Sequence, residues 1–432
     1  MSLKKFLIAT FLLAVTSQMQ VPVDAEELHR MNLQLLSQGA TLVKPQTDQK
    51  KNQQSAEDYF KLGVSLNDAK QWEEAMPAFQ QAIRLKPDYA EAHYKLGVAF
   101  FNLDRFEDAI ERFKAAIRFK KDYADAYFNL GMSLFKLERW QEAIDVYQRE
   151  LPYNSKDPDL YYAIALAYDY LEQIKKATSF YKQAIALKAD HAKAHLGLGL
   201  IYDNSGHHAE AVEENKKAIA AVQDYADAYY NLAIALANLG RWNECVEAYT
   251  NALRFYPFYL RFRPTYARAY AYLSLGNGKA AAEDARTYIR LKGWSDEGTL
   301  YMVIVAYLGY RQAKDDNNAT NILNDATRQY KTTADIDIVG TEGGMNRQPT
   351  PSWPYPLIQY FRRELTSQTI TNFAKNDGQI IQLKTYTGLN FSLLNDRANA
   401  IASLRWVKAK GPQKGLLNEY RLALAELNRL EK

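Results

Sequence analysis

Residues 90–123 read AEAHYKLGVAFFNLDRFEDAIERFKAAIRFKKDY, and residues 124–157 read ADAYFNLGMSLFKLERWQEAIDVYQRELPYNSKD. The two stretches have the same length, 34 residues, and carry the same kinds of residue at matching positions. The dipeptides Leu96-Gly97 and Leu130-Gly131 fix the alignment between them. A fixed step of this length is typical of a repeat protein, in which each unit packs against its neighbours.

The same step continues on both sides of these two stretches. Six units follow one another without a gap and begin at Ala56, Ala90, Ala124, Pro158, Ala192 and Ala226. Small residues recur at the eighth and twentieth positions of the unit, and large aromatic residues recur at the twenty-fourth. Small residues let two helices approach closely, and large residues fill the space between them.

Each unit is predicted to contain two helices. Gly206 and Gly240 stand between the two helices of their units, where the chain must turn. Asp88, Asp122 and Asp224 come just before a new unit, and we expect them to cap its first helix. The chain is therefore predicted to belong to the all-α class.

This pattern strongly resembles the tetratricopeptide repeat family. The family's characteristic residues all occur in the first unit, as Tyr59, Leu62, Gly63, Ala75, Phe79, Ala82 and Pro87. The six matching units span residues 56–89, 90–123, 124–157, 158–191, 192–225 and 226–259. The resemblance implies a solenoid of helix-turn-helix units that winds into a right-handed superhelix and serves as a protein-binding scaffold.

A less regular C-terminal region follows the six units. Residues 262–293 are predicted to form a degenerate seventh unit, and residues 295–330 a degenerate eighth. Residues 331–356 are rich in proline and glycine and are predicted to be a loop that packs partly through Trp353 and Tyr355.

Helical spacing returns in residues 357–432 and ends in a predicted capping helix over residues 416–430. This C-terminal part resembles the bacterial periplasmic repeat lipoproteins of the new-lipoprotein-I kind. The resemblance implies an adaptor for envelope proteases and cell-wall hydrolases.

The N-terminus is organised like a secretory signal peptide. Lys4 and Lys5 precede an apolar run over residues 6–15, and Ala25 ends a cleavage site of small residues. We expect cleavage after Ala25, export to the periplasm or the cell exterior, and a polar linker over residues 26–55. An uncleaved anchor or a buried helix is the alternative. No later segment is long and apolar enough to predict a transmembrane helix in the mature chain.

The composition excludes several kinds of chemistry. Cys245 is the only cysteine, so an internal disulfide is impossible. A net charge of +4 is too small to predict nucleic-acid binding. His191 and His195 have the spacing of a shared metal site, but no further ligand is spaced to join them, and packing is the better interpretation. We expect no metal, no cofactor and no catalytic residue.

In the tetratricopeptide family, the first helix of each unit lines the concave face, and positions 5 and 9 point into the groove. Lysine and asparagine, which many members use there to hold a carboxylate tail, are absent at these positions. We therefore expect the groove to hold an apolar or aromatic segment of a partner. The alternative is that these side chains only pack between units. The predicted groove residues are Phe60, Val64, Tyr94, Val98, Phe101, Phe128, Met132, Phe135, Tyr162, Leu166, Leu196, Leu200, Tyr230 and Ile234.

A second candidate site is a group of four arginines interleaved with aromatic residues: Arg254, Arg261, Arg263 and Arg268. Such a group can bind acidic peptides, phosphate or glycans. The favoured alternative is a junction between units, with the arginines stacked on aromatic rings.

Three functions follow from these features. The first is a non-catalytic scaffold or adaptor that binds a protein or peptide segment outside the cytoplasm. The second is a structural component of an envelope or secretion assembly, which would self-associate. The third and most remote is an enzyme hidden in residues 331–432.

Overall fold

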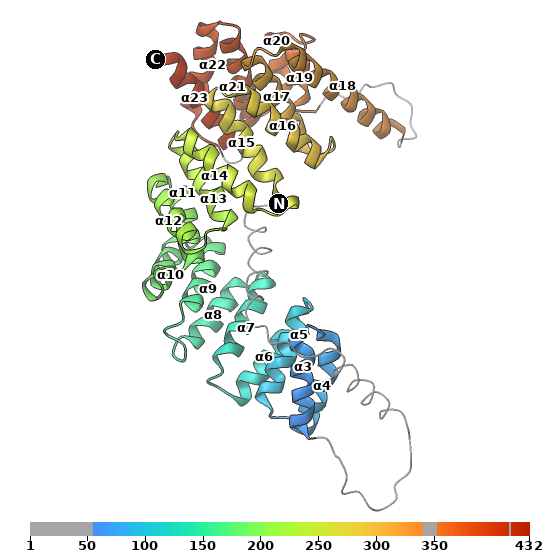
Figure 1. The fold of residues 1–432 in the computed structure, drawn as a ribbon, viewed down its shortest axis with the longest axis vertical. Coiled ribbons are helices and arrows are strands. Elements are labelled where there is room, and N and C mark those ends of the chain that lie inside the picture. The colour runs from blue at the N-terminus through green and yellow to red at the C-terminus, as the bar shows by residue number, and fades with distance from the viewer. Residues whose placement is uncertain (1–54, 340–351, 414–415) are drawn as a thin grey trace, which may run out of the picture. The chain divides into compact units, whose positions relative to one another are not determined.

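The computed structural model describes residues 55–339, 352–413 and 416–432. In these ranges the regular secondary structure is entirely helical, which confirms the predicted all-α class (Figure 1). The predicted signal peptide and nearly all of the predicted linker lie outside the described residues. The chain divides into two compact parts, Met1–Leu187 and Lys188–Lys432.

The described residues of the first part form four consecutive helix pairs. These are α3 (Ala56–Asp68) with α4 (Trp72–Leu85), α5 (Ala90–Asn102) with α6 (Phe106–Phe119), α7 (Ala124–Lys136) with α8 (Trp140–Glu150), and α9 (Pro158–Tyr170) with α10 (Ile174–Leu187). Each first helix begins at the first residue of a 34-residue unit, and each pair packs against the next.

The two helices of a unit meet where a glycine faces an aromatic ring. A Cβ atom on Gly97 would lie 2.7 Å from Cε1 of Phe113, and a Cβ atom on Gly131 would lie 2.3 Å from Cε1 of Tyr147. Both rings are fully buried. A small residue recurs at this position because the ring occupies the space that a large side chain would need.

Each turn between the helices of a unit contains one residue with a positive φ. The value is +82° at Gly206 and +69° at Gly240, as a glycine turn allows. In the first part the same place is held by residues other than glycine, namely Lys70, Asp104, Glu138 and Glu172. These positions carry backbone strain, because a Cβ atom disfavours the left-handed region.

We expect Lys70→Gly to raise the free energy of unfolding by about 0.5–1 kcal/mol, because Lys70 has a φ of 60° and is exposed. The matched control is Lys61→Gly inside α3, which should lower that free energy by about 1 kcal/mol. Urea denaturation of the full chain measures both changes. A loss of stability in Lys70→Gly would contradict the turn geometry.

The caps of the first helices differ from the prediction. The N-cap residues are Tyr89, Tyr123 and Tyr225, without a side-chain capping bond, and the predicted aspartates each lie one residue earlier. The Tyr89 ring lies 4.9 Å from that of Phe60, and the Tyr123 ring lies 4.9 Å from that of Tyr94. The cap position is thus occupied by a side chain that packs between neighbouring units.

The second part begins with four more helix pairs. These are α11 (Ala192–Asn204) with α12 (His208–Ala221), α13 (Ala226–Asn238) with α14 (Trp242–Phe255), α15 (Phe262–Leu275) with α16 (Gly278–Lys292), and α17 (Glu297–Gln312) with α18 (Asp316–Val339). The short helix η1 (Phe258–Leu260) lies between α14 and α15.

The predicted loop over residues 331–356 is wrong at both ends. Helix α18 continues to Val339, and α19 (Tyr355–Phe361) already begins at Tyr355. Residues 331–339 contain neither glycine nor proline, so nothing in their sequence ends the helix before Gly340. Residues 340–351 lie outside the described residues.

The end of the predicted loop packs into the second part, as expected. The Tyr355 ring is buried and stacks on Tyr330, with 3.7 Å between ring centroids. The Trp353 Nε1 donates a hydrogen bond of 2.7 Å to Oε1 of Gln382. Both side chains therefore join the core of the C-terminal region.

The remaining elements are α20 (Ser367–Ile370), η2 (Thr371–Phe373), α21 (Asp377–Leu393), α22 (Arg397–Lys410) and α23 (Leu417–Glu431). Helices α21 and α22 form a repeat-like pair, in which a Cβ atom on Gly388 would lie 2.9 Å from Cδ2 of Leu404. Helix α23 packs on this pair and also on α15. No helix in the described ranges combines the length and the apolar character needed to cross a membrane.

Candidate functional site

Where the first helices of neighbouring units contact one another, they lie closer together than the second helices of those units do. Contacts join α3 to α5 and α5 to α7 in the first part, and α11 to α13 in the second, whereas the second helices of the same units are farther apart. In a curved array the closer helices lie on the inner side. The predicted groove residues therefore belong to the inner helices of both parts.

The aromatic rings at position 5 of the first two units are each held between two other rings. The Phe60 ring lies 5.9 Å from that of Phe79 in its own unit and 4.9 Å from that of Tyr89. The Tyr94 ring lies 5.8 Å from that of Phe113 and 4.9 Å from that of Tyr123. These rings therefore pack between units and at the same time keep part of their surface exposed.

Seven of the predicted groove residues in the first part are half-buried, and these are Phe60, Val64, Tyr94, Val98, Phe101, Phe128 and Leu166. They leave an apolar strip along the inner helices of this part. Val98 and Leu166 stand at position 9, one turn after the position-5 side chain of the same helix.

Three other predicted groove residues of the first part are buried, so their assignment to an open groove is wrong. They are Met132, Phe135 and Tyr162. The Phe135 ring is covered by Tyr170, 5.1 Å away, and the Tyr162 ring packs 5.9 Å from that of Tyr181. For these side chains the packing alternative holds.

In the second part, Leu200, Tyr230 and Ile234 are half-buried, whereas Leu196 is buried. Leu196 packs with Ala218 and Ala228 between two units, which corrects its assignment to the groove. This part therefore offers a smaller apolar strip, on α11 and α13.

Polar groups that the prediction omitted flank the apolar strip of the first part. The Asn129 Nδ2 donates a hydrogen bond of 3.2 Å to the Tyr94 hydroxyl. Burial raises the pKa of that hydroxyl, and the carboxylate of Asp125 raises it further. Position 2 of the unit is acidic in all four units of this part, with Glu57, Glu91, Asp125 and Asp159. This recurrence is visible in the sequence and could have predicted the acidic groups beside the strip.

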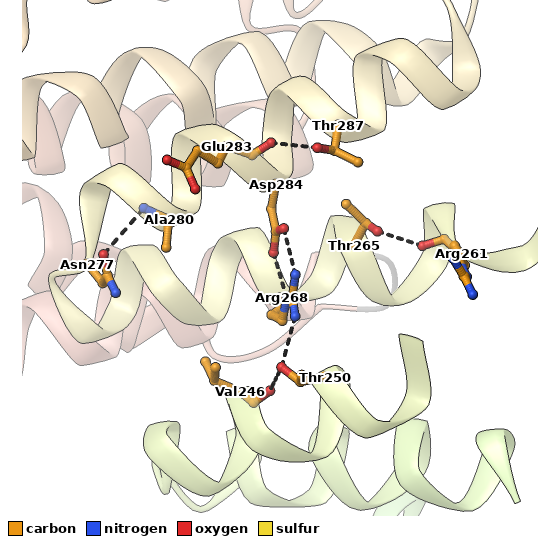
Figure 2. A network of polar contacts seen from close by, with 10 residues as sticks. All are labelled: Val246, Thr250, Arg261, Thr265, Arg268, Asn277, Ala280, Glu283, Asp284 and Thr287. Atoms are coloured by element: carbon orange, nitrogen blue, oxygen red, sulfur yellow. Dashed lines mark hydrogen bonds and ion pairs between the residues drawn. The ribbon is translucent and has the colours of Figure 1, made fainter. Parts of the chain in front are cut away.

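Arg268, a member of the candidate arginine site, is engaged within the chain. Its Nε and Nη2 atoms donate to the carboxylate of Asp284 at 2.7 and 2.8 Å, and its Nη1 donates to Thr250 Oγ1 at 2.8 Å. Figure 2 shows Arg268 on α15 between Asp284 on α16 and Thr250 on α14. This arginine therefore joins two neighbouring units and is not offered to a ligand.

The other three arginines of this group also contact the chain. The guanidinium of Arg263 lies 5.1 Å from the centre of the Tyr230 ring, and that of Arg254 lies 5.5 Å from the centre of the Phe255 ring. Arg261 Nε donates to the Tyr256 carbonyl oxygen at 3.2 Å. The arrangement matches the favoured alternative, a junction whose arginines lie on aromatic rings.

The contacts that hold α23 in place were not predicted from the sequence. Glu419 of this helix is buried, and its Oε1 accepts hydrogen bonds from Tyr386 at 3.0 Å and Gln382 at 3.3 Å. The Tyr386 hydroxyl lies 2.8 Å from that of Tyr270 on α15. Burial raises the pKa of Glu419. This network ties the C-terminal helix to the inner helix of the seventh unit.

His191, His195 and Cys245 have structural roles. His195 binds Glu214 Oε2 through Nδ1 at 2.6 Å and the Ala189 carbonyl oxygen through Nε2 at 2.9 Å, and His191 Nδ1 accepts from Ala194 N. Burial raises the pKa of Cys245 to about 12, which keeps its thiol protonated. The described residues contain no cluster of His, Cys, Asp or Glu that could hold a metal ion.

Models of known protein families match most of the regular units. A model described as TPR repeat matches residues 63–104. Models described as tetratricopeptide repeat match residues 102–159, 158–191, 192–221 and 226–259. No match was found among curated proteins.

Several solved structures are also similar to this chain. MamA is 30% identical over 38% of this chain and 96% of its own, with a TM-score of 0.36. YrrB, described as a TPR protein with an unusual peptide-binding site, is 23% identical over 42% of this chain and 93% of its own, with a TM-score of 0.35. PilF of Pseudomonas aeruginosa is 16% identical over 48% and 95%, with a TM-score of 0.43.

Proposed function

We propose that this chain, which is a tetratricopeptide-repeat protein, is a non-catalytic scaffold that binds an apolar or aromatic protein segment along its inner helices. Repeats of this family bind protein or peptide partners. The observation that carries the proposal is the strip of half-buried apolar side chains that recurs on α3, α5, α7 and α9.

The size of this strip fits a moderate affinity. Burying a fully exposed side chain such as valine or leucine is worth about 1.5–3 kcal/mol; each strip residue, which is at most about a third exposed, gains at most about a third of that, and each matching side chain of an extended partner gains up to the whole. Seven such side chains, and as many on the partner, exceed the roughly 8 kcal/mol of a micromolar complex before ordering costs are subtracted. A short segment is therefore a sufficient ligand.

The acidic residues beside the strip indicate further chemistry in the partner. Glu91 and Asp125 stand at position 2, and Tyr94 and Phe128 follow one turn later on the same helix faces. A partner that places lysine or arginine next to its apolar side chains would meet these carboxylates. Such charges direct the encounter and fix the register more than they add affinity.

We expect the double variant Val98→Glu/Ile234→Glu to weaken peptide binding about 10- to 100-fold, because each change places a carboxylate among apolar contacts. One substitution lies in each part of the chain. The probe is a fluorescein-labelled decapeptide selected from a random library on the full chain, and fluorescence anisotropy measures its Kd.

The matched control is Leu85→Glu/Val222→Glu, which places the same charges at exposed sites at the C-terminal ends of two second helices. Its Kd should stay within about twofold of the unmodified chain. Circular dichroism should show the same helix content for all three proteins. Equal weakening by the two double variants would contradict an inner-face site.

We also propose that the scaffold acts outside the cytoplasm, in the periplasm or beyond the cell. The support is the predicted signal peptide with its basic, apolar and small-residue segments. The absence of a catalytic motif in the sequence supports a function that depends on binding alone.

A further inference from the structure

A cleft of ≈ 490 Å³ lies beside the C-terminal helix in the second part of the chain. One wall is α23, with Tyr420, Arg421 and Leu424, and the opposite wall is formed by the ends of α11 and α13 and the start of α14. Asp203 and Asn238 line that opposite wall. The volume is within the range of small-ligand and side-chain pockets.

Arg421 is the unusual residue of this cleft. This residue is only 8% exposed, and its Nε donates a hydrogen bond of 2.7 Å to Oδ1 of Asn238. Its Nη2 is buried without a hydrogen-bond partner. Among the described residues it forms no direct ion pair, and Asp203, the carboxylate that lines the same cleft, is linked to it only through Asn238.

The neighbouring polar groups hold Arg421 in this position. Asn238 Nδ2 donates to Oδ1 of Asp203 at 2.9 Å, and His208 Nδ1 donates to the same oxygen at 2.7 Å. Asn238 is therefore fixed by Asp203 and presents its own carbonyl oxygen to Arg421. This chain of bonds orients the guanidinium before any ligand arrives.

We propose that the cleft binds a carboxylate group of a peptide partner and that Arg421 is its anchor. A guanidinium matches a carboxylate with two parallel hydrogen bonds, and a buried charge without a partner is unfavourable until an opposite charge joins it. Asp203 on the facing wall repels a dianion such as phosphate more strongly than a singly charged carboxylate. The apolar side chains of Trp242 and Leu424 suit the atoms next to the carboxylate.

This inference rests on the proposed function, because it takes the ligand to be a peptide. The carboxylate is either the C-terminus of the peptide or an acidic side chain. The lysine and asparagine positions that repeats of this family use for carboxylate tails are not involved, since Arg421 comes from a helix outside the regular units.

The test uses a random decapeptide library with free C-termini, selected on the full chain. Each selected peptide is made in three forms: unchanged, with a C-terminal amide, and with its acidic side chains replaced by the corresponding amides. Loss of affinity of about 10- to 100-fold on neutralising one of these groups supports the proposal and identifies the source of the carboxylate. Neutral forms that all bind within twofold of the original overturn it.

Variants test the anchor itself. Arg421→Gln should weaken binding of the unchanged peptide by about 10- to 100-fold and abolish its preference over the neutral form, whereas Arg421→Lys should keep part of that preference. The control is Arg405→Gln, at an exposed site on α22. Ala425→Trp fills the cleft without altering the anchor and should also block binding, so the proposal stays testable if Arg421→Gln does not fold.

The two proposals can fail separately. If neutral peptides bind as well as acidic ones but Val98→Glu/Ile234→Glu abolishes binding, the inner-face function stands and the anchor is refuted. If neither neutralising the peptide nor the double variant Val98→Glu/Ile234→Glu alters Kd, both the anchor and the inner-face function are refuted.

Discussion

Gly131→Leu should unfold the third unit locally while the rest of the array stays folded. A Cβ atom at this place would already lie 2.3 Å from the Tyr147 ring, which is fully buried, so a leucine side chain fits only if that ring is displaced. Overpacking of this kind costs about 3 kcal/mol, and in a stacked array the loss stays near the altered unit. Hydrogen exchange followed by mass spectrometry should show faster exchange in α7 and α8 than in α3 and α4.

Gly131→Ala is the graded control for this change. The fourth unit carries Ala165 at the same position, where it is buried in the unit that also contains the buried Tyr181. A single methyl group should therefore cost about 1 kcal/mol and speed exchange only slightly. Unchanged exchange in Gly131→Leu would contradict the close contact between α7 and α8.

Glu150→Ala should stabilise the chain at pH 8. Glu150 is fully buried, its Oε2 has no hydrogen-bond partner, and its Oε1 accepts one bond of 3.1 Å from Asn154. The other units of the first part place a fully buried alanine at this position, as Ala82, Ala116 and Ala184. The unit around Glu150 therefore holds a carboxylate where its neighbours hold a methyl group.

The effect of Glu150 depends on pH. Burial raises the pKa of this carboxyl group from 4.5 to about 7, and the carboxylates of Asp157 and Asp125 add to the shift, against the bond from Asn154. The folded state therefore holds the proton more tightly than the unfolded state. Its contribution to stability is complete below pH 4.5 and is lost as the pH rises through 7, which amounts to about 3 kcal/mol above that pH.

Urea denaturation of the full chain at pH 5 and pH 8 measures this difference. Glu150→Ala should be more stable than the unmodified chain by about 2–3 kcal/mol at pH 8, with a much smaller difference at pH 5. The control is Glu142→Ala on the exposed side of the same helix, which should change stability by less than about 0.5 kcal/mol. If the Glu150→Ala chain is less stable than the unmodified chain at pH 8, the claim that Glu150 is a buried and destabilising carboxylate is refuted.

The regular part of the fold could be predicted because every unit repeats the same local requirement. The helix pairs follow from small residues such as Gly97 and large ones such as Phe113, which must meet in each unit. The early end of α8 at Glu150 also has a local cause, since Pro152 lacks an N–H group and restricts the residue before it.

Features without a repeating pattern could not be predicted in this way. The bond from Arg421 to Asn238 joins residues of two distant segments, and no periodicity in the sequence relates them. The burial of Phe135 depends on Tyr170 in the next unit, so position within the unit alone did not reveal it. Position 5 and position 9 indicate the inner face, but the neighbouring side chains decide how much of each residue stays exposed.

The most direct test of the inner-face site is site-specific photo-crosslinking with the selected decapeptide. A photoreactive phenylalanine analogue is placed at Val98, Ile234, Leu85 or Val222 in the full chain, one at a time. We expect peptide adducts from Val98 or Ile234 on the inner helices and none from Leu85 or Val222. Adducts only from Leu85 or Val222 would contradict the scaffold proposed here.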